Sequence, residues 1–142
     1  MSDHMTGHSV IALVTLAALL LYFYMGLQVG QARGKFGVAA PATTGHPEFE
    51  RYHRVHMNTL EWMVIFLPCL WMSHLFSTEW EPISTAVVAV VGVAWIIGRF
   101  IYMQSYVKDP ATRSRGFIIQ ALATLILTLM VIAEAVIGLL PQ

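Results

Sequence analysis

A polar stripe interrupts an otherwise apolar region of the chain. Its residues Arg51, Arg54, Asn58 and Glu61 are spaced by three, four and three positions, which places them on one face of a helix. If that helix enters a bilayer, the stripe carries polar groups progressively deeper. A buried carboxylate or amide costs several kcal/mol unless it is paired, so these groups must face protein, water or a ligand. The stripe therefore predicts either a polar contact between helices or a polar binding site at membrane depth.

A second stripe follows later in the sequence. Arg99, Tyr102 and Tyr106 are also spaced to share one helix face, and Arg113 comes just beyond them. The two stripes contain more cations than acids, because Glu61 is the only deep acid near them. Arginines without a carboxylate partner bind anions, and a neighbouring amide or phenol can fix the anion's orientation. Two interpretations stay open for Arg99: it binds the anion, or it pairs with Glu61 and only joins two helices.

Composition predicts the elements that must position the two stripes. Hydrophobic residues make up 57% of the 142-residue chain and charged residues 11%, which is too few charges to cover a water-soluble surface. A spanning helix needs about 20 mostly apolar residues, whereas membrane strands would show an alternation that is absent here. The helical segments are expected at about 8–32, 47–76, 83–106 and 116–140. We therefore expect a single all-α domain over residues 1–142, an integral membrane four-helix bundle.

The distribution of basic residues predicts the orientation in the membrane. Lysines and arginines flank the loop after the first segment and the loop before the fourth. The opposite side, made of both termini and the acidic segment 77–82, contains no lysine and no arginine. Because antiparallel helices bring the two basic loops to one side, the positive-inside rule places these loops in the cytoplasm and both termini across the membrane. That membrane would be the inner membrane of a bacterium or the endoplasmic reticulum of a eukaryote.

Both stripes resemble the patterns of a known family. Residues 27–61 resemble the signature region of the MAPEG superfamily, the membrane-associated proteins of eicosanoid and glutathione metabolism, and contain the pattern ERxxRxHxNxxE. A second similar pattern, RxxYxxxYxxxxxxR, runs from Arg99 to Arg113. With the helix pattern and the length, the resemblance covers essentially the whole chain. Within the superfamily, the sequence most resembles the microsomal glutathione transferases and the leukotriene-forming synthase.

The resemblance implies a fold, an assembly and an activity. It implies a homotrimer that holds glutathione between neighbouring subunits near the cytosolic face. The implied enzyme is a glutathione transferase that activates the thiol as a thiolate for conjugation to hydrophobic electrophiles, with peroxidase activity toward lipid hydroperoxides as a further expectation. Arg113 matches the arginine that stabilises the thiolate. The family's glutathione-contacting positions correspond to Arg33, Arg54, His56, Asn58, Glu61, Tyr102 and Tyr106.

Departures from the family's pattern leave alternatives open. The leukotriene-forming enzyme has an arginine and an aromatic hydroxyl at the positions of Gly34 and Trp62, so an assignment to leukotriene synthesis is weakened. A non-catalytic lipid-binding protein of the same superfamily is the main alternative, although such a protein would be expected to lack some of the arginines in the pattern. A small drug exporter would need a carboxylate in the first helix, which has none.

Neither a metal site nor a nucleic-acid site is expected. Glu50 and His53 form one ExxH motif, whereas diiron bundles use two such motifs with further glutamates. Cys69 is the single cysteine, which excludes an internal disulfide and a multi-cysteine metal site. The net charge of zero provides no basic field for nucleic acid. Glu134, an acid within the fourth segment, is left without a role.

Overall fold

Long apolar runs separated by Gly- and Pro-containing loops fold into α-helices. The structure is a computed structural model that describes residues 2–77 and 82–139. Its elements are α1 (Ser2–Phe36), α2 (Pro47–Ser77), α3 (Pro82–Lys108), the 3-10 turn η1 (Pro110–Thr112) and α4 (Ser114–Gly138). No strand occurs among these described residues. Each α-helix contains a stretch long and apolar enough to cross a membrane, so the predicted all-α membrane class is confirmed.

The helix boundaries agree with the prediction except in the first helix. That helix was expected over residues 8–32, but it extends from Ser2 to Phe36. The expectation counted only the apolar run, whereas the polar residues on either side also adopt helical geometry. Basic residues fill its last turn, where the helix dipole favours cations. Pro47 begins α2 as predicted, in the first turn where proline is tolerated. The predicted end of the last helix, Leu140, lies outside the described residues.

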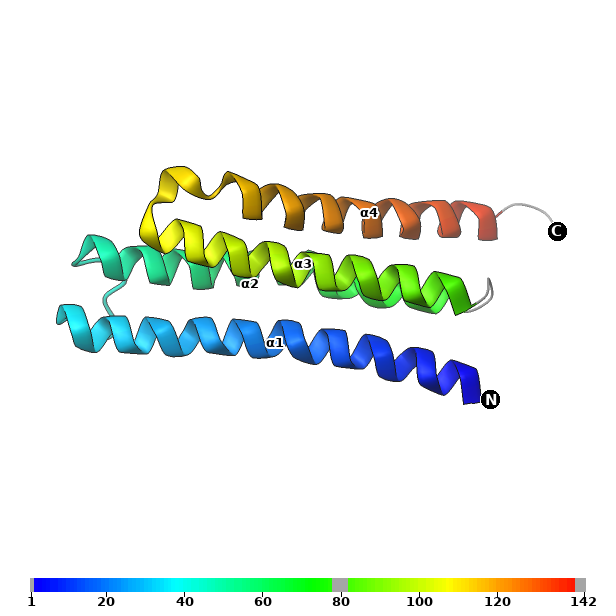
Figure 1. Ribbon diagram of the computed structural model, residues 1–142, viewed down its shortest axis with the longest axis horizontal. Coiled ribbons are helices and arrows are strands. Elements are labelled where there is room, and N and C mark those ends of the chain that lie inside the picture. Colours follow the sequence, from blue (N-terminus) through cyan, green and yellow to red (C-terminus); the bar gives the residue numbers. More distant parts are fainter. Residues whose placement is uncertain (1, 78–81, 140–142) are drawn as a thin grey trace.

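Both basic loops lie at the same end of the molecule. The helices alternate in direction, so the α1–α2 loop and the α3–α4 connection meet at one end, while the start of α1 and the end of α4 lie at the other (Figure 1). This confirms that the two loops share one end, as the antiparallel prediction required. Which end faces the cytoplasm stays a prediction. Residues 78–81, most of the predicted acidic loop, lie outside the described part of the chain.

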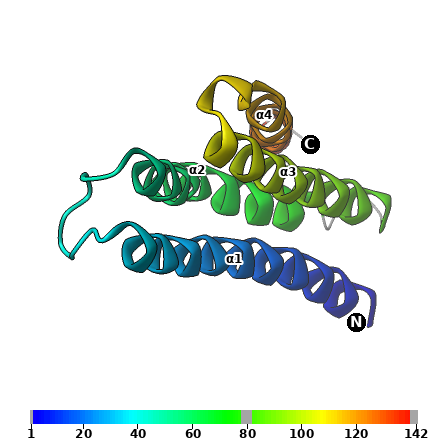
Figure 2. The ribbon, with the colours of Figure 1, turned by 60° about the vertical axis from the view of Figure 1, so that its left-hand side comes forward.

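The helices are arranged in layers. The pair formed by α2 and α3 lies between α1 on one side and α4 on the other (Figure 2). The outer helices therefore keep a wide apolar surface, which includes Leu13 and Phe23 on α1 and Leu129 and Ile132 on α4. In a membrane such surfaces face lipid or another subunit.

Aromatic packing joins the two central helices. The rings of Phe66 on α2 and Trp95 on α3 are stacked, with centroids 4.0 Å apart and planes within 3° of each other. Both side chains are fully buried, together with Ile11 of α1 and Leu127 of α4. The four helices thus share one core, and this core holds the polar stripes of α2 and α3 in register.

Glycine allows α3 and α4 to approach closely beside the second stripe. A Cβ atom on Gly116 would lie 2.3 Å from the backbone nitrogen of Tyr102 and 2.7 Å from the carbonyl oxygen of Gly98. Both neighbours are backbone atoms, which cannot rotate away as a side chain would. The contact therefore sets the distance between α4 and the part of α3 that carries Tyr102.

Gly116→Ala is expected to destabilise the protein by more than about 2 kcal/mol, because overpacking against backbone forces two helices apart. Gly138→Ala is the matched control on the same helix. Among the described residues, no atom lies within 4 Å of a Cβ placed at Gly138, so this change should be neutral or stabilising by up to about 1 kcal/mol. Thermal unfolding of both variants in the same detergent measures the difference. Equal melting temperatures for the two variants would contradict the packing argument.

Candidate functional site

A chain of polar contacts runs from the surface of α2 into the interior. Arg54 Nη1 lies 3.5 Å from Glu61 Oε1, and both side chains are more than half exposed. Asn58 Nδ2 donates to the other carboxylate oxygen, Glu61 Oε2, at 3.1 Å. Arg99 Nη1 of α3 donates to Asn58 Oδ1, also at 3.1 Å. Three residues of the first stripe, Arg54, Asn58 and Glu61, therefore contact one another, and Arg99 of α3 extends this cluster into the interior.

Arg99 occupies the buried end of this chain. Its side chain is completely buried, and Nη2 donates to Thr59 Oγ1 at 2.6 Å. Its guanidinium carbon also lies 4.3 Å from the centre of the Tyr102 ring, a cation–π contact. Asn58 stands between Arg99 and Glu61, and Glu61 pairs with Arg54 instead. For Arg99, the structure therefore favours a structural role over direct contact with an external anion.

The second stripe continues from the interior toward the basic end. The rings of Tyr102 and Tyr106 are 5.4 Å apart, and the Arg113 guanidinium lies 5.6 Å from the Tyr106 ring. Tyr102 is 4% exposed, whereas Tyr106 is half-buried and Arg113 is exposed. Arg113 immediately precedes α4, so its charge adds to the positive end of that helix's dipole. The structure thus brings these three predicted residues together.

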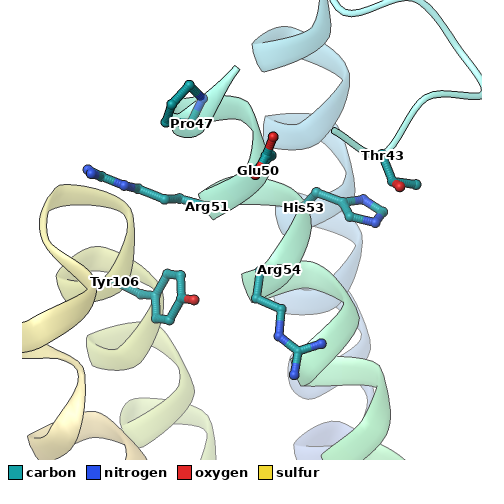
Figure 3. Close-up of a pocket in the computed structure, with 7 residues that line it drawn as sticks. All are labelled: Thr43, Pro47, Glu50, Arg51, His53, Arg54 and Tyr106. Carbon is teal, nitrogen blue, oxygen red and sulfur yellow. The ribbon is translucent and has the colours of Figure 1, made fainter. Parts of the chain in front are cut away.

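A cavity of about 380 Å³ opens between the start of α2 and the end of α3. This volume lies within the range of about 300–1,000 Å³ typical of small-molecule sites. In Figure 3 the Tyr106 ring projects from α3 toward α2, Arg54 extends along α2, and Arg51 reaches from α2 toward the end of α3. Its lining residues are Thr43, Pro47, Glu50, Arg51, His53, Arg54 and Tyr106.

Several lining residues were missed or misjudged from the sequence. Thr43 comes from the α1–α2 loop, whose path cannot be read from residue spacing. Glu50 and His53 were weighed as a metal motif that was set aside, and neither was assigned to a binding site. Glu50 instead accepts a hydrogen bond from the Gly45 backbone at 3.0 Å, and the described residues contain no group of three or more potential metal ligands. The neighbouring arginines of the first stripe were the available signal, because residues one turn before them extend the same cavity.

Arg51 joins the two helices that border the cavity. Its Nη1 donates to the carbonyl oxygens of Lys108 at 3.0 Å and Val107 at 3.3 Å. These carbonyls belong to the last turn of α3, whose final carbonyls lack partners within the helix. Arg51 therefore caps α3 and fixes the position of Tyr106 relative to α2.

Two predicted site residues lie away from the others. Arg33 donates to the carbonyl oxygens of Ala42 at 2.7 Å and Val38 at 3.4 Å, so it holds the α1–α2 loop. The His56 ring stacks on Tyr22 of α1, with centroids 4.3 Å apart. Since His56 and Arg54 are two residues apart on a helix, their side chains diverge. The structure does not bring Arg33 and His56 into the polar chain of Arg54, Asn58, Glu61 and Arg99.

The fold and the site define a class: an integral membrane protein of four helices with a cationic polar site toward the end that carries its basic loops. The profile of the MAPEG family matches residues 11–133. The chain belongs to the MAPEG family.

Individual relatives agree with this assignment. Over 132 residues the chain is 36% identical to leukotriene C4 synthase of Bos taurus, covering 93% of this chain and 81% of the relative. Over 127 residues it is 34% identical to microsomal glutathione S-transferase 2 of Homo sapiens, covering 89% and 82%. Over 116 residues it is 41% identical to an uncharacterised protein of Synechocystis, covering 82% and 80%. Its relatives therefore include glutathione-using membrane enzymes.

Proposed function

We propose that this protein is a membrane-bound glutathione transferase that ionises the glutathione thiol and conjugates it to hydrophobic electrophiles. The observation that carries the proposal is the exposed polar face made by Arg54, Asn58 and Glu61 beside Tyr106 and Arg113. Apart from Arg113, which immediately precedes α4, these groups lie on helices able to span a membrane, where exposed charges are costly and mark functional sites. Peroxidase activity toward lipid hydroperoxides is part of the same proposal.

The chemistry of glutathione fits this set of side chains. Glutathione has two carboxylates, one ammonium group and one thiol. The planar guanidinium of Arg54 suits a carboxylate, because it can donate two parallel charge-assisted hydrogen bonds. Glu61 supplies the negative charge for the ammonium group, and Asn58 and Tyr106 supply hydrogen bonds that fix orientation. The cavity between α2 and α3 provides room at the basic end.

Arg113 is proposed to stabilise the thiolate. A free cysteine thiol has a pKa of about 8.5, so only a small fraction is ionised at neutral pH. A guanidinium beside the sulfur favours the anion, and the positive end of the α4 dipole acts in the same direction. The thiolate sulfur then forms a bond to the electrophilic carbon while the leaving group departs with its electron pair.

A neighbouring subunit is proposed to complete the site. Arg54 and Glu61 are more than half exposed on a spanning helix, and a homotrimer would shield them from lipid. Arg33 and His56, which face away from the polar chain within one subunit, would then contribute to the site of a neighbour. The hydrophobic electrophile would reach the sulfur from the bilayer, where it partitions. In this proposal the basic loops face the cytoplasm.

Glutathione binding is the first test. Purified protein in detergent should bind glutathione at or below millimolar concentration, measured by titration calorimetry. It should also conjugate glutathione to a generic aryl halide. S-methylglutathione is the matched control, because it keeps both carboxylates and the ammonium group but has no thiol; it should bind without turnover. Absence of glutathione binding at millimolar concentration would favour the alternative, a non-catalytic lipid-binding protein of the same family.

A further inference from the structure

The buried guanidinium of Arg99 has an unusual set of partners. It donates to Asn58 Oδ1 at 3.1 Å and to Thr59 Oγ1 at 2.6 Å, and it covers the Tyr102 ring. All three partners are uncharged side chains. A buried cation is costly, and an apolar residue of similar volume would join helices at least as well. Packing alone therefore does not explain an arginine at this position.

Hydrogen-bond polarity determines how the Asn58 amide is oriented. A guanidinium has donors and no acceptor, so the amide atom that faces Arg99 must be the oxygen. The amide nitrogen then faces the other way, where it meets Glu61 Oε2 at 3.1 Å. A flipped amide would place its nitrogen against the guanidinium and its oxygen against the carboxylate, which is unfavourable at both contacts. The hydrogen bond from Arg99 thus allows only one orientation of the Asn58 amide.

We propose that Arg99 is a positioning residue that locks the Asn58 amide so that its NH₂ group points into the glutathione site. This rests on the proposed function and extends it to a residue that is itself 0% exposed. One amide hydrogen is engaged by Glu61. The second is directed to an acceptor of the bound tripeptide, a carboxylate or peptide carbonyl. The guanidinium also polarises the amide, which strengthens its N–H groups as donors.

The Asn58 amide, held in place by Arg99, also determines the orientation of the Glu61 carboxylate. Asn58 holds one carboxylate oxygen and Arg54 approaches the other at 3.5 Å. The carboxylate is therefore held from two sides, and its remaining lone pairs face the exposed site. A chain of alternating donors and acceptors, from Arg99 through Asn58 to Glu61, thus prepares an acceptor for the ammonium group and a donor for a carboxyl or carbonyl group.

Arg99→Met tests the proposal, because methionine fills a similar volume and lacks donors. The glutathione KM is expected to rise about tenfold, while kcat and the KM of the aryl halide change less than about threefold. Arg99→Lys, which keeps one charged donor for Asn58 Oδ1, should restore most of the glutathione affinity. A residue that only joined helices would instead lower the melting temperature and the active fraction and leave the glutathione KM unchanged.

Asn58→Asp keeps the buried arginine and tests the donor directly. The aspartate can pair with Arg99, so the fold is maintained, but it offers no N–H to the site and repels Glu61. We expect the same rise in glutathione KM of about tenfold or more. In an Asn58→Ala background, adding Arg99→Met should cause no further rise, because Arg99 acts through Asn58.

The outcomes separate this inference from the proposed function. If the unmodified protein neither binds nor conjugates glutathione, the proposed function is wrong. If the unmodified protein binds glutathione and both Asn58→Asp and Arg99→Met retain its KM, only the positioning role is wrong. Additive effects of Arg99→Met and Asn58→Ala would also overturn it, since they would show that Arg99 acts by another route.

Discussion

Arg113→Ala is expected to lower kcat for conjugation at pH 7 about 25-fold, with a change in glutathione affinity of less than about threefold. The guanidinium is exposed at the start of α4 and lies 5.6 Å from the Tyr106 ring, at the edge of the polar site. A lowering of the thiol pKa by about two units corresponds to roughly 2.7 kcal/mol, and its loss would leave most of the bound thiol protonated. Stopped-flow detection of thiolate absorbance and steady-state kinetics measure the two quantities.

The pH dependence of kcat shows in which direction Arg113 shifts the pKa of the bound thiol. A nearby cation lowers the pKa of the bound thiol, so the thiolate persists to lower pH in the unmodified enzyme. Without Arg113, the rise of kcat with pH should move about two units toward alkaline pH, and Arg113→Lys should lie between the two. Arg115→Ala, another exposed arginine of the same turn, is the control and should leave the profile unchanged. An unaltered profile in Arg113→Ala would refute the role of Arg113.

The fold was predictable because each helix depends mainly on local sequence. A long apolar run satisfies its own backbone hydrogen bonds as a helix, and Pro47 marks the start of α2 without any knowledge of tertiary structure. The layered order of the helices was not predictable in this way. It depends on contacts such as that of Gly116 with the Tyr102 backbone, which involve residues distant in sequence and show no periodicity.

The candidate site was predictable in part, for a related reason. Helical spacing placed Arg54, Asn58 and Glu61 on one face, and they do contact one another. Spacing gives the face of a helix but not the atoms on the opposite helix. From the sequence, Arg51 was expected to be available to an anion, and the family resemblance implied a glutathione contact for Arg33. Both instead donate to backbone carbonyl oxygens. A hydrogen bond to a neutral carbonyl does not cancel the positive charge of a guanidinium. The excess of positive charge that would attract an anion therefore remains, although both groups already have hydrogen-bond partners.

Exchange of charges between Arg54 and Glu61 separates a ligand site from an ion pair that only stabilises the helix. The two residues lie on the same helix with their charged groups 3.5 Å apart, so the exchange preserves both the ion pair and the net charge at these positions. The double variant Arg54→Glu with Glu61→Arg keeps an ion pair at the same positions. It should therefore unfold within about 3 °C of the unmodified protein.

Glutathione binding should respond quite differently to the exchange. The double variant presents a carboxylate where a glutathione carboxylate is expected and a guanidinium where the ammonium group is expected. Affinity should fall more than about 100-fold, since two like-charge contacts replace two attractive ones. Arg54→Lys, which keeps the charge but loses the planar fork, should reduce affinity only about tenfold. Calorimetric titration measures these affinities. If the exchanged pair restored glutathione binding to that of the unmodified protein, the two side chains would be a structural pair, and the glutathione site would have to lie elsewhere on the molecule.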